Sequence, residues 1–112
     1  MPYRSAVEEY RFILDHVAGL ADVTATDRYA EATPDVVAAV LTEAGRMCDH
    51  VLAPLNRVGD TDGARLENGV VRTPAGFADG HAAIAEGGWV AISADPVNGG
   101  MGLPHAVATA VN

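Results

Sequence analysis

The sequence predicts an all-α protein of four helices with one small β-hairpin. Apolar residues recur every three or four positions in several stretches, which is the spacing of one helix face. Asn68-Gly69 lies between two short β-forming runs, and Asn-Gly is a preferred pair for two-residue hairpin turns. The chain has 112 residues, which fits a single domain.

The first helix is expected at about residues 6–18. Ser5-Ala6-Val7-Glu8 has the pattern of a capping box, and Gly19 is a plausible stop. Residues 20–32 are weakly patterned and predict at most one short helical turn. The apolar face of the first helix comprises Val7, Tyr10, Ile13, Leu14 and Val17.

The second helix is expected to begin at Thr33, which suits the N-cap, with Pro34 at the first helical position. Pro54 should end or kink it, and the pattern can continue to about residue 58 if Ala53 absorbs a bend. Its apolar stripe should be the most buried part of the fold. The stripe comprises Val36, Val37, Val40, Leu41, Ala44, Met47, Cys48, Val51 and Leu52.

The hairpin is expected over residues 65–72, after a loop at 59–63. Because an isolated hairpin is marginally stable, it should pack on the helices. The third helix is expected at about 75–86, with Gly87-Gly88 ending it. A glycine-rich loop then leads to Pro104, which opens a fourth helix that the end of the chain truncates.

Charge and composition exclude several classes of protein. The net charge is −8, and the seven basic residues are all arginines, which argues against nucleic acid or an anionic membrane as a partner. No apolar run approaches the roughly 20 residues of a transmembrane helix. Cys48 is the single cysteine, so no internal disulfide can form, and a reducing cytoplasm is the simplest location.

Two features invite a chemical interpretation. Gly99-Gly100-Met101-Gly102 before a helix could cradle an anion, but it lacks the P-loop pattern, and a tight turn that needs glycines is the alternative. Cys48 lies on the apolar stripe, where a cysteine usually behaves as a small hydrophobe rather than as a nucleophile. The histidines form no recognised metal pattern and suit the surface or an interface: His16, His50, His81 and His105.

The acidic residues offer no marked acid–base pair, so solvated positions are expected. Those considered are Glu8, Glu9, Asp60, Asp62 and Asp79. Asp60 is expected to stabilise its loop. Trp89, which follows Gly87-Gly88, is expected to serve in packing, because its ring needs burial.

Several segments, taken together in their order and spacing, resemble the acyl-CoA dehydrogenase family. The most informative runs from Gly87-Gly88-Trp89 through Asp95-Pro96 to Gly99-Gly100-Met101-Gly102. The others are Tyr29–Asp35, Ala53–Asp60, Asn68–Val71 and Thr73–Phe77. The resemblance covers nearly the whole chain and is closest to a subgroup of large acyl-CoA dehydrogenases.

The resemblance implies that residues 1–112 are the N-terminal α-helical domain of a longer, FAD-dependent enzyme. In that family a carboxylate removes the α-proton of an acyl-CoA thioester, the flavin takes the β-hydride, and a 2-enoyl-CoA results. No position matches the catalytic glutamate, and Glu67 and Glu86 lie in the wrong domain. We therefore assign no catalytic, cofactor-binding or metal-ligating residue to this chain. Its implied role is one wall of the acyl pocket, with domain and subunit packing.

Two alternatives stay open: a stand-alone acidic helical module that dimerises without catalysis, and a small enzyme without flavin. On the dehydrogenase hypothesis the 112-residue piece alone binds no FAD and turns over no acyl-CoA. A homo-oligomer is expected, held by apolar residues of the final third. These residues are Trp89, Ile92, Met101, Leu103 and Val107.

Overall fold

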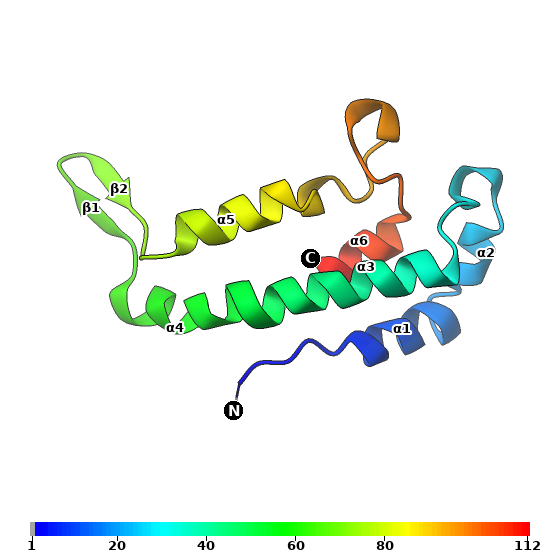
Figure 1. Cartoon of the computed structure of the whole chain (residues 1–112), viewed down its shortest axis with the longest axis horizontal. Coiled ribbons are helices and arrows are strands. Elements are labelled where there is room, and N and C mark those ends of the chain that lie inside the picture. Colours follow the sequence, from blue (N-terminus) through cyan, green and yellow to red (C-terminus); the bar gives the residue numbers. More distant parts are fainter. Residues whose placement is uncertain (1) are drawn as a thin grey trace.

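The computed structural model describes residues 2–112, in which helices are arranged along one long helical row (Figure 1). That row consists of α3, a π-helical turn and α4, and it passes between α1 on one side and α5 on the other. The elements are α1 (Val7–His16), α2 (Leu20–Thr24), α3 (Pro34–Met47), the π turn (Cys48–Leu52), α4 (Ala53–Asp62), β1 (Arg65–Glu67), β2 (Val70–Arg72), α5 (Phe77–Glu86) and α6 (His105–Val111). The predicted class, all-α with a hairpin, is confirmed.

The start of α3 follows the sequence signals. The Thr33 hydroxyl accepts a hydrogen bond from the Val36 N–H at 3.3 Å, and Pro34 occupies the first turn, where its missing N–H costs nothing. The start of α1 does not follow the sequence signals. No side chain caps this helix, because Ser5 bonds to Asp49 instead. The predicted capping box is therefore wrong.

The long row continues through Pro54. A proline cannot donate the hydrogen bond that an α-helix requires at that position. The chain meets this by widening one turn: the Ala53 N–H donates to the Cys48 carbonyl, five residues back. The π turn thus replaces the predicted bend at Ala53, and α4 runs on to Asp62 rather than ending near 58.

The hairpin forms where it was expected. Asn68 and Gly69 have φ of 50° and 78°, as a type I′ turn requires, and Leu66 pairs with Val71 across the strands. Every residue from Ala64 to Thr73 is exposed, so the expectation that the hairpin packs on the helices is wrong. Figure 1 shows it extending from one end of the molecule.

The core lies at the opposite end, among α1, α2, α3 and α6. It comprises Leu14, Leu20, Ala32, Val37, Leu41, Ile92, Leu103, Val107 and Ala108. Val107 has a relative exposure of 0% and Ile92 of 2%. The final third of the chain therefore closes the core, and the expected apolar patch on its surface does not exist as such; of its members only Met101 is exposed.

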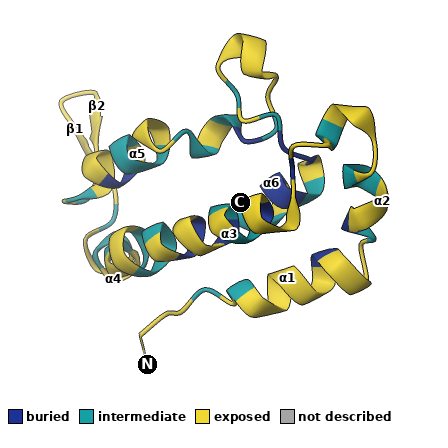
Figure 2. Cartoon of the chain, turned by 45° about the vertical axis from the view of Figure 1, so that its right-hand side comes forward, coloured by how far each residue is buried: buried dark blue, intermediate teal, exposed yellow. Residues whose placement is uncertain are grey.

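The two predicted apolar faces are buried only in part. The part of the stripe on α3 is buried at Val37, Leu41 and Ala44, whereas Val51 in the π turn is exposed. The stripe is therefore not uniformly the most buried element. On α1 only Leu14 is buried. Figure 2 shows buried residues mainly on α3 and α6, whereas α4 and α5 are mostly intermediate or exposed and the hairpin is exposed.

The molecule is a thin, open slab. Its principal extents are 53 × 37 × 18 Å and its Cα radius of gyration is 16.7 Å, against about 13 Å for a compact domain of this length. Its accessible surface is 7888 Å², whereas a compact monomer of this mass exposes about 5,800 Å². Roughly 2,000 Å² of surface is thus exposed that a compact fold would bury.

Candidate functional site

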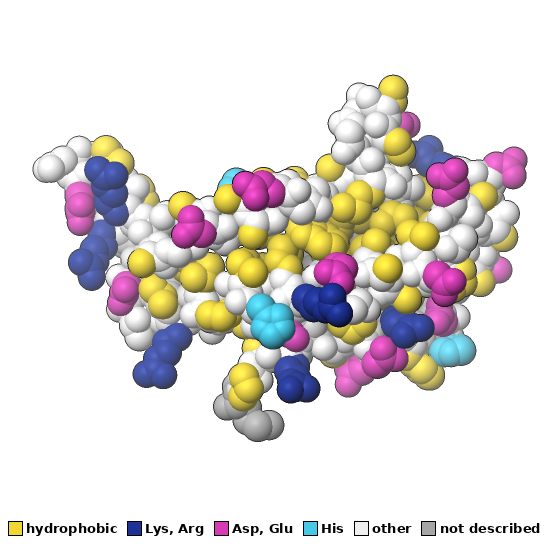
Figure 3. All heavy atoms as spheres, in the orientation of Figure 1, with side chains coloured by type: hydrophobic (Ala, Val, Ile, Leu, Met, Phe, Trp, Pro, Cys, Tyr) yellow, Lys and Arg dark blue, Asp and Glu magenta, His cyan; other side chains and the backbone are white. Residues whose placement is uncertain are grey.

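An apolar trough lies between the long helical row and α5. It is an open hollow of about 370 Å³. Figure 3 shows hydrophobic side chains gathered between α5 and the α3–α4 row. We define the trough by its lining: Leu52, Leu55, Asn56, Phe77, Gly80, His81 and Ile84.

Glycines hold the two walls of the trough together. A Cβ at Gly76 or Gly80 would lie 2.7 Å from a methyl carbon of Leu55, so this leucine fits only because both positions lack a side chain. In the opposite direction, the Phe77 ring lies over Gly59, where a Cβ would be 2.7 Å from Cζ. Each helix therefore inserts one large side chain into a glycine notch of the other.

A second hollow adjoins the trough on the other side of Leu52. It encloses about 400 Å³ and is lined by Tyr3, Cys48, Leu52, Ala53 and Asn56. Leu52 and Asn56 line both spaces, so they form the ridge between them. Such a surface can hold an apolar chain or an apolar side chain, with the Asn56 amide and the Tyr3 hydroxyl as its hydrogen-bonding groups.

The segment before α1 is fixed to the π turn by Asp49. The Ser5 backbone N–H and hydroxyl both donate to Asp49 Oδ1, at 2.7 and 2.8 Å, and the hydroxyl also reaches the Gly45 carbonyl at 3.3 Å. The two Ser5 bonds, with His50 and Arg4 nearby, lower the pKa of Asp49. Local sequence reasoning missed this contact, since the partners are 44 positions apart.

Cys48 is half-buried beside this anchor. Burial, and secondarily the negative charge of Asp49, raise the pKa of its thiol. A thiol that is held protonated is a poor nucleophile, which agrees with the prediction that this cysteine serves in packing.

The glycine-rich loop is a tight turn. The N–H groups of Gly100, Met101, Gly102 and Leu103 donate to the carbonyls of Asp95, Ala91, Ala94 and Ile92 at 2.9–3.1 Å. A Cβ at Gly100 would collide with the Ala94 carbonyl. Because these N–H groups have partners within the loop, they are not free to cradle an anion.

The histidines do not converge. His16 stacks near Phe12, with ring centroids 4.8 Å apart, and His81 lines the trough from an exposed position. His50 and His105 are also exposed. Among residues 2–112, no three His, Cys, Asp or Glu side chains are placed to hold a metal ion.

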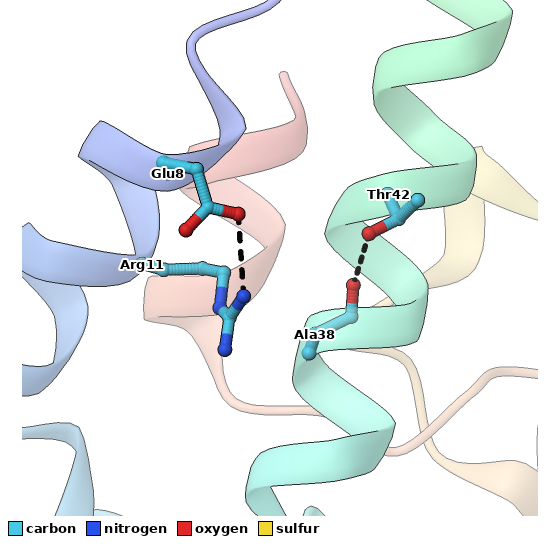
Figure 4. A network of polar contacts seen from close by, with 4 residues as sticks. All are labelled: Glu8, Arg11, Ala38 and Thr42. Carbon is cyan, nitrogen blue, oxygen red and sulfur yellow. Dashed lines mark hydrogen bonds and ion pairs between the residues drawn. The ribbon is translucent and has the colours of Figure 1, made fainter.

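The carboxylates are solvated, as expected. Glu8 forms an ion pair with Arg11 at 3.3 Å on the surface of α1 (Figure 4). The same figure shows the Thr42 hydroxyl of α3, which donates a hydrogen bond to the Ala38 carbonyl at 2.8 Å. The other carboxylates considered are all exposed: Glu9, Asp60, Asp62, Glu67, Asp79 and Glu86. None lies in the buried surroundings that acid–base catalysis uses.

Trp89 has the packing role that was predicted. Its indole lies against Gly87, where a Cβ would collide with the ring, and the side chain is half-buried against the core. A further hollow of about 600 Å³ lies beyond it, between the Asp27–Tyr29 turn and Asp95-Pro96. Several charged groups line this hollow, with Arg28 over the Tyr29 ring at 5.5 Å.

The fold and the trough thus define a mostly helical unit with one hairpin and an uncovered apolar surface. No family model matches the chain. The chain is 39% identical over 110 residues to the 3-methylmercaptopropionyl-CoA dehydrogenase of Ruegeria pomeroyi, which covers 98% of this chain and 19% of that protein. This similarity confirms the resemblance to the acyl-CoA dehydrogenase family.

The chain spans about a fifth of the length of that relative. In the described part of the chain, no helix is long and apolar enough to cross a membrane.

Proposed function

We propose that the chain is the N-terminal helical domain of an FAD-dependent acyl-CoA dehydrogenase. The observation that supports this most is the 39% identity over 98% of the chain to a protein of that activity. In the complete protein, bound FAD would supply the hydride acceptor for the α,β-dehydrogenation of an acyl-CoA. We assign no residue of this chain to take the α-proton, since the acidic residues weighed for that role are all exposed.

On this proposal the trough forms one wall of the acyl pocket. Its lining is mostly apolar, it is open along one side, and it is kept at a fixed width by the glycine notches around Leu55 and Phe77. We place the flavin site outside the chain, and the hydrogen-bonded N–H groups of the glycine-rich loop, the one candidate for its phosphates, support this placement.

The roughly 2,000 Å² of excess surface supports the second part of the proposed role, which is packing against other domains or subunits. Permanent interfaces have this size. The single cysteine of the chain, Cys48, is free, and we propose a reducing cytoplasm as its location.

The test compares the product of the complete gene with the 112-residue chain. The complete product should be yellow, with stoichiometric FAD, and should reduce an electron acceptor when given an acyl-CoA. The 112-residue chain should be colourless and inactive. Stoichiometric flavin in the short chain would refute the placement of the flavin site, and a flavin-free complete product would refute the proposed function.

The acyl-wall role has its own test in the complete protein. Ile84→Trp should narrow the trough and lower kcat/KM for long acyl chains roughly tenfold relative to short ones. Val97→Trp, at a position that is 84% exposed in a distant loop, is the control. Equal effects on all chain lengths would show that the trough does not hold the acyl group.

A stand-alone dimerisation module is the second candidate, and the open apolar surface favours it equally. The dehydrogenase domain and the stand-alone module differ in what the gene should encode beyond Asn112. A β-domain followed by a helical domain supports the dehydrogenase, and a stop codon supports the module.

A further inference from the structure

The hairpin is the one β element of the described chain, and it is uncovered on both faces. Leu66 and Val71 form a cross-strand pair on one face, with relative exposures of 73% and 64%. On the other face Arg65 lies directly opposite Arg72, so two like charges meet. A two-stranded hairpin in water is marginal by itself, and three or more strands are needed for independent stability.

The outer edge of β1 has hydrogen-bonding groups that point away from the hairpin. In a two-residue hairpin the pair that flanks the turn, here Glu67 and Val70, exchanges hydrogen bonds. Bonding alternates along an antiparallel strand, so the Leu66 N–H and C=O face outward from β1. They form a donor and an acceptor at the centre of an open edge.

The sequence of β1 is complementary to itself in the antiparallel direction. When two copies of Arg65-Leu66-Glu67 pair about Leu66, Arg65 of each lies opposite Glu67 of the other. The two Leu66 residues exchange both backbone bonds at the two-fold axis. Opposite charges directly across an antiparallel pair are stabilising, and the added carboxylates also offset the repulsion between Arg65 and Arg72.

We propose that the β1 edge is a homodimer contact, in which two hairpins join about Leu66 into one four-stranded antiparallel sheet. The occupant is a second copy, because the Arg65-Leu66-Glu67 edge is complementary in charge to itself when it pairs about Leu66. One face of the joined sheet carries an unbroken row of Val71, Leu66, Leu66 and Val71. This goes beyond the proposed function and does not depend on it.

The other edge does not have this complementarity. If two β2 strands paired about Val71, Val70 would lie opposite Arg72, which offers no ion pair. In the isologous arrangement about Leu66, the Leu66 residues of the two copies are therefore direct neighbours, whereas the two Val71 residues are not.

Disulfide trapping in the product of the complete gene tests this geometry. With Cys48→Ala as background, Leu66→Cys places two cysteines with Cα atoms about 5.5 Å apart, within the range that a disulfide spans. Val71→Cys is the matched control: its copies are three strand spacings apart, about 14 Å, and cannot be bridged. Under mild oxidation we expect a covalent dimer from Leu66→Cys alone.

Charge reversal tests the pairing independently. Adding Arg65→Glu to the Leu66→Cys protein should slow trapping severalfold, although it relieves the clash with Arg72 within the hairpin. Adding Arg65→Glu and Glu67→Arg together should restore trapping. Positions 65 and 67 of the two copies then again carry opposite charges across the two-fold axis. Arg72→Glu, the same charge change on β2, should not slow it.

Several results would overturn the proposal: no covalent dimer from Leu66→Cys, equal trapping of Val71→Cys, or no rescue by the double reversal. Trapping of other proteins in place of a second copy would also overturn it. Disulfide trapping reports only whether the two Leu66 positions are close together. A larger assembly held through other surfaces would therefore not change its result.

Discussion

Leu41 contributes to the core from the middle of the α3 face, with a relative exposure of 3%, while Val51 on the same sequence stripe is 36% exposed. Leu41→Ala should therefore lower the free energy of unfolding of the 112-residue chain by about 2–5 kcal/mol, through lost burial and a cavity. Val51→Ala should cost well under about 1 kcal/mol. Urea denaturation measures both, and equal losses would mean that the core extends along the whole stripe.

Asp49 makes the stability depend on pH. Its pKa in the folded state is lowered by the two Ser5 bonds, while the unfolded value is about 3.9. A depressed folded pKa stabilises the fold above the unfolded pKa, and this contribution is lost as the pH falls through the folded pKa. Asp49→Asn should thus lower the Tm at pH 7, and its difference from the parent chain should shrink toward pH 3.

Two controls isolate the Ser5 contact in that experiment. Asp60→Asn changes an exposed aspartate and should leave the Tm unchanged. In a Ser5→Ala background the effect of Asp49→Asn should become much smaller, because the hydroxyl that favours the charged carboxylate is gone. An undiminished effect would assign the charge dependence to another contact.

At the scale of elements, the turn before α6 depends on one glycine. A Cβ at Gly100 would collide with a backbone carbonyl, which cannot rotate away as a side chain could. Gly100→Ala should cost at least about 2 kcal/mol. The adjacent Gly99 has a φ of 82° and open space around it, so Gly99→Asn, which tolerates that conformation, should cost much less. Thermal melting of the two variants compares them directly.

At the scale of the whole molecule, the open slab has a measurable size. X-ray scattering of the monomeric 112-residue chain at low concentration should give a radius of gyration near 17 Å rather than the roughly 13 Å of a compact domain. The exposed trough should also bind a hydrophobic dye. A compact radius without dye binding would mean that α5 closes onto the long row in solution.

The sequence was sufficient where local signals decide the structure. Thr33-Pro34 set the start of α3, and Asn68-Gly69 set the hairpin turn. It was insufficient where distant contacts compete with local ones. Ser5 bonds to Asp49 rather than capping α1, and Ile92, Leu103 and Val107 pack into the core rather than forming a surface patch.

The trough was only partly predictable. Phe77, His81 and Ile84 follow the spacing of one face of the helix expected at 75–86, but the wall opposite them depends on how far the long row runs past Pro54. The signal that was present is the set of Gly59, Gly76 and Gly80, which act as notches only once two helices face each other. Helical periodicity alone does not reveal such a pairing.

The π turn at Cys48–Leu52 also has a consequence for how this chain can change length. A π turn holds one more residue than an α turn, so it can accommodate one extra residue without changing the direction in which α4 faces. Removing one residue from the α-helical part of the row before Leu55 would instead rotate the rest of α4 by about 100° about its axis. Leu55 would then leave its notches and the hairpin would turn with α4. Length variation among homologues should therefore avoid the α-helical part of the row and fall at the π turn or at the Asn68-Gly69 tip, where nothing packs.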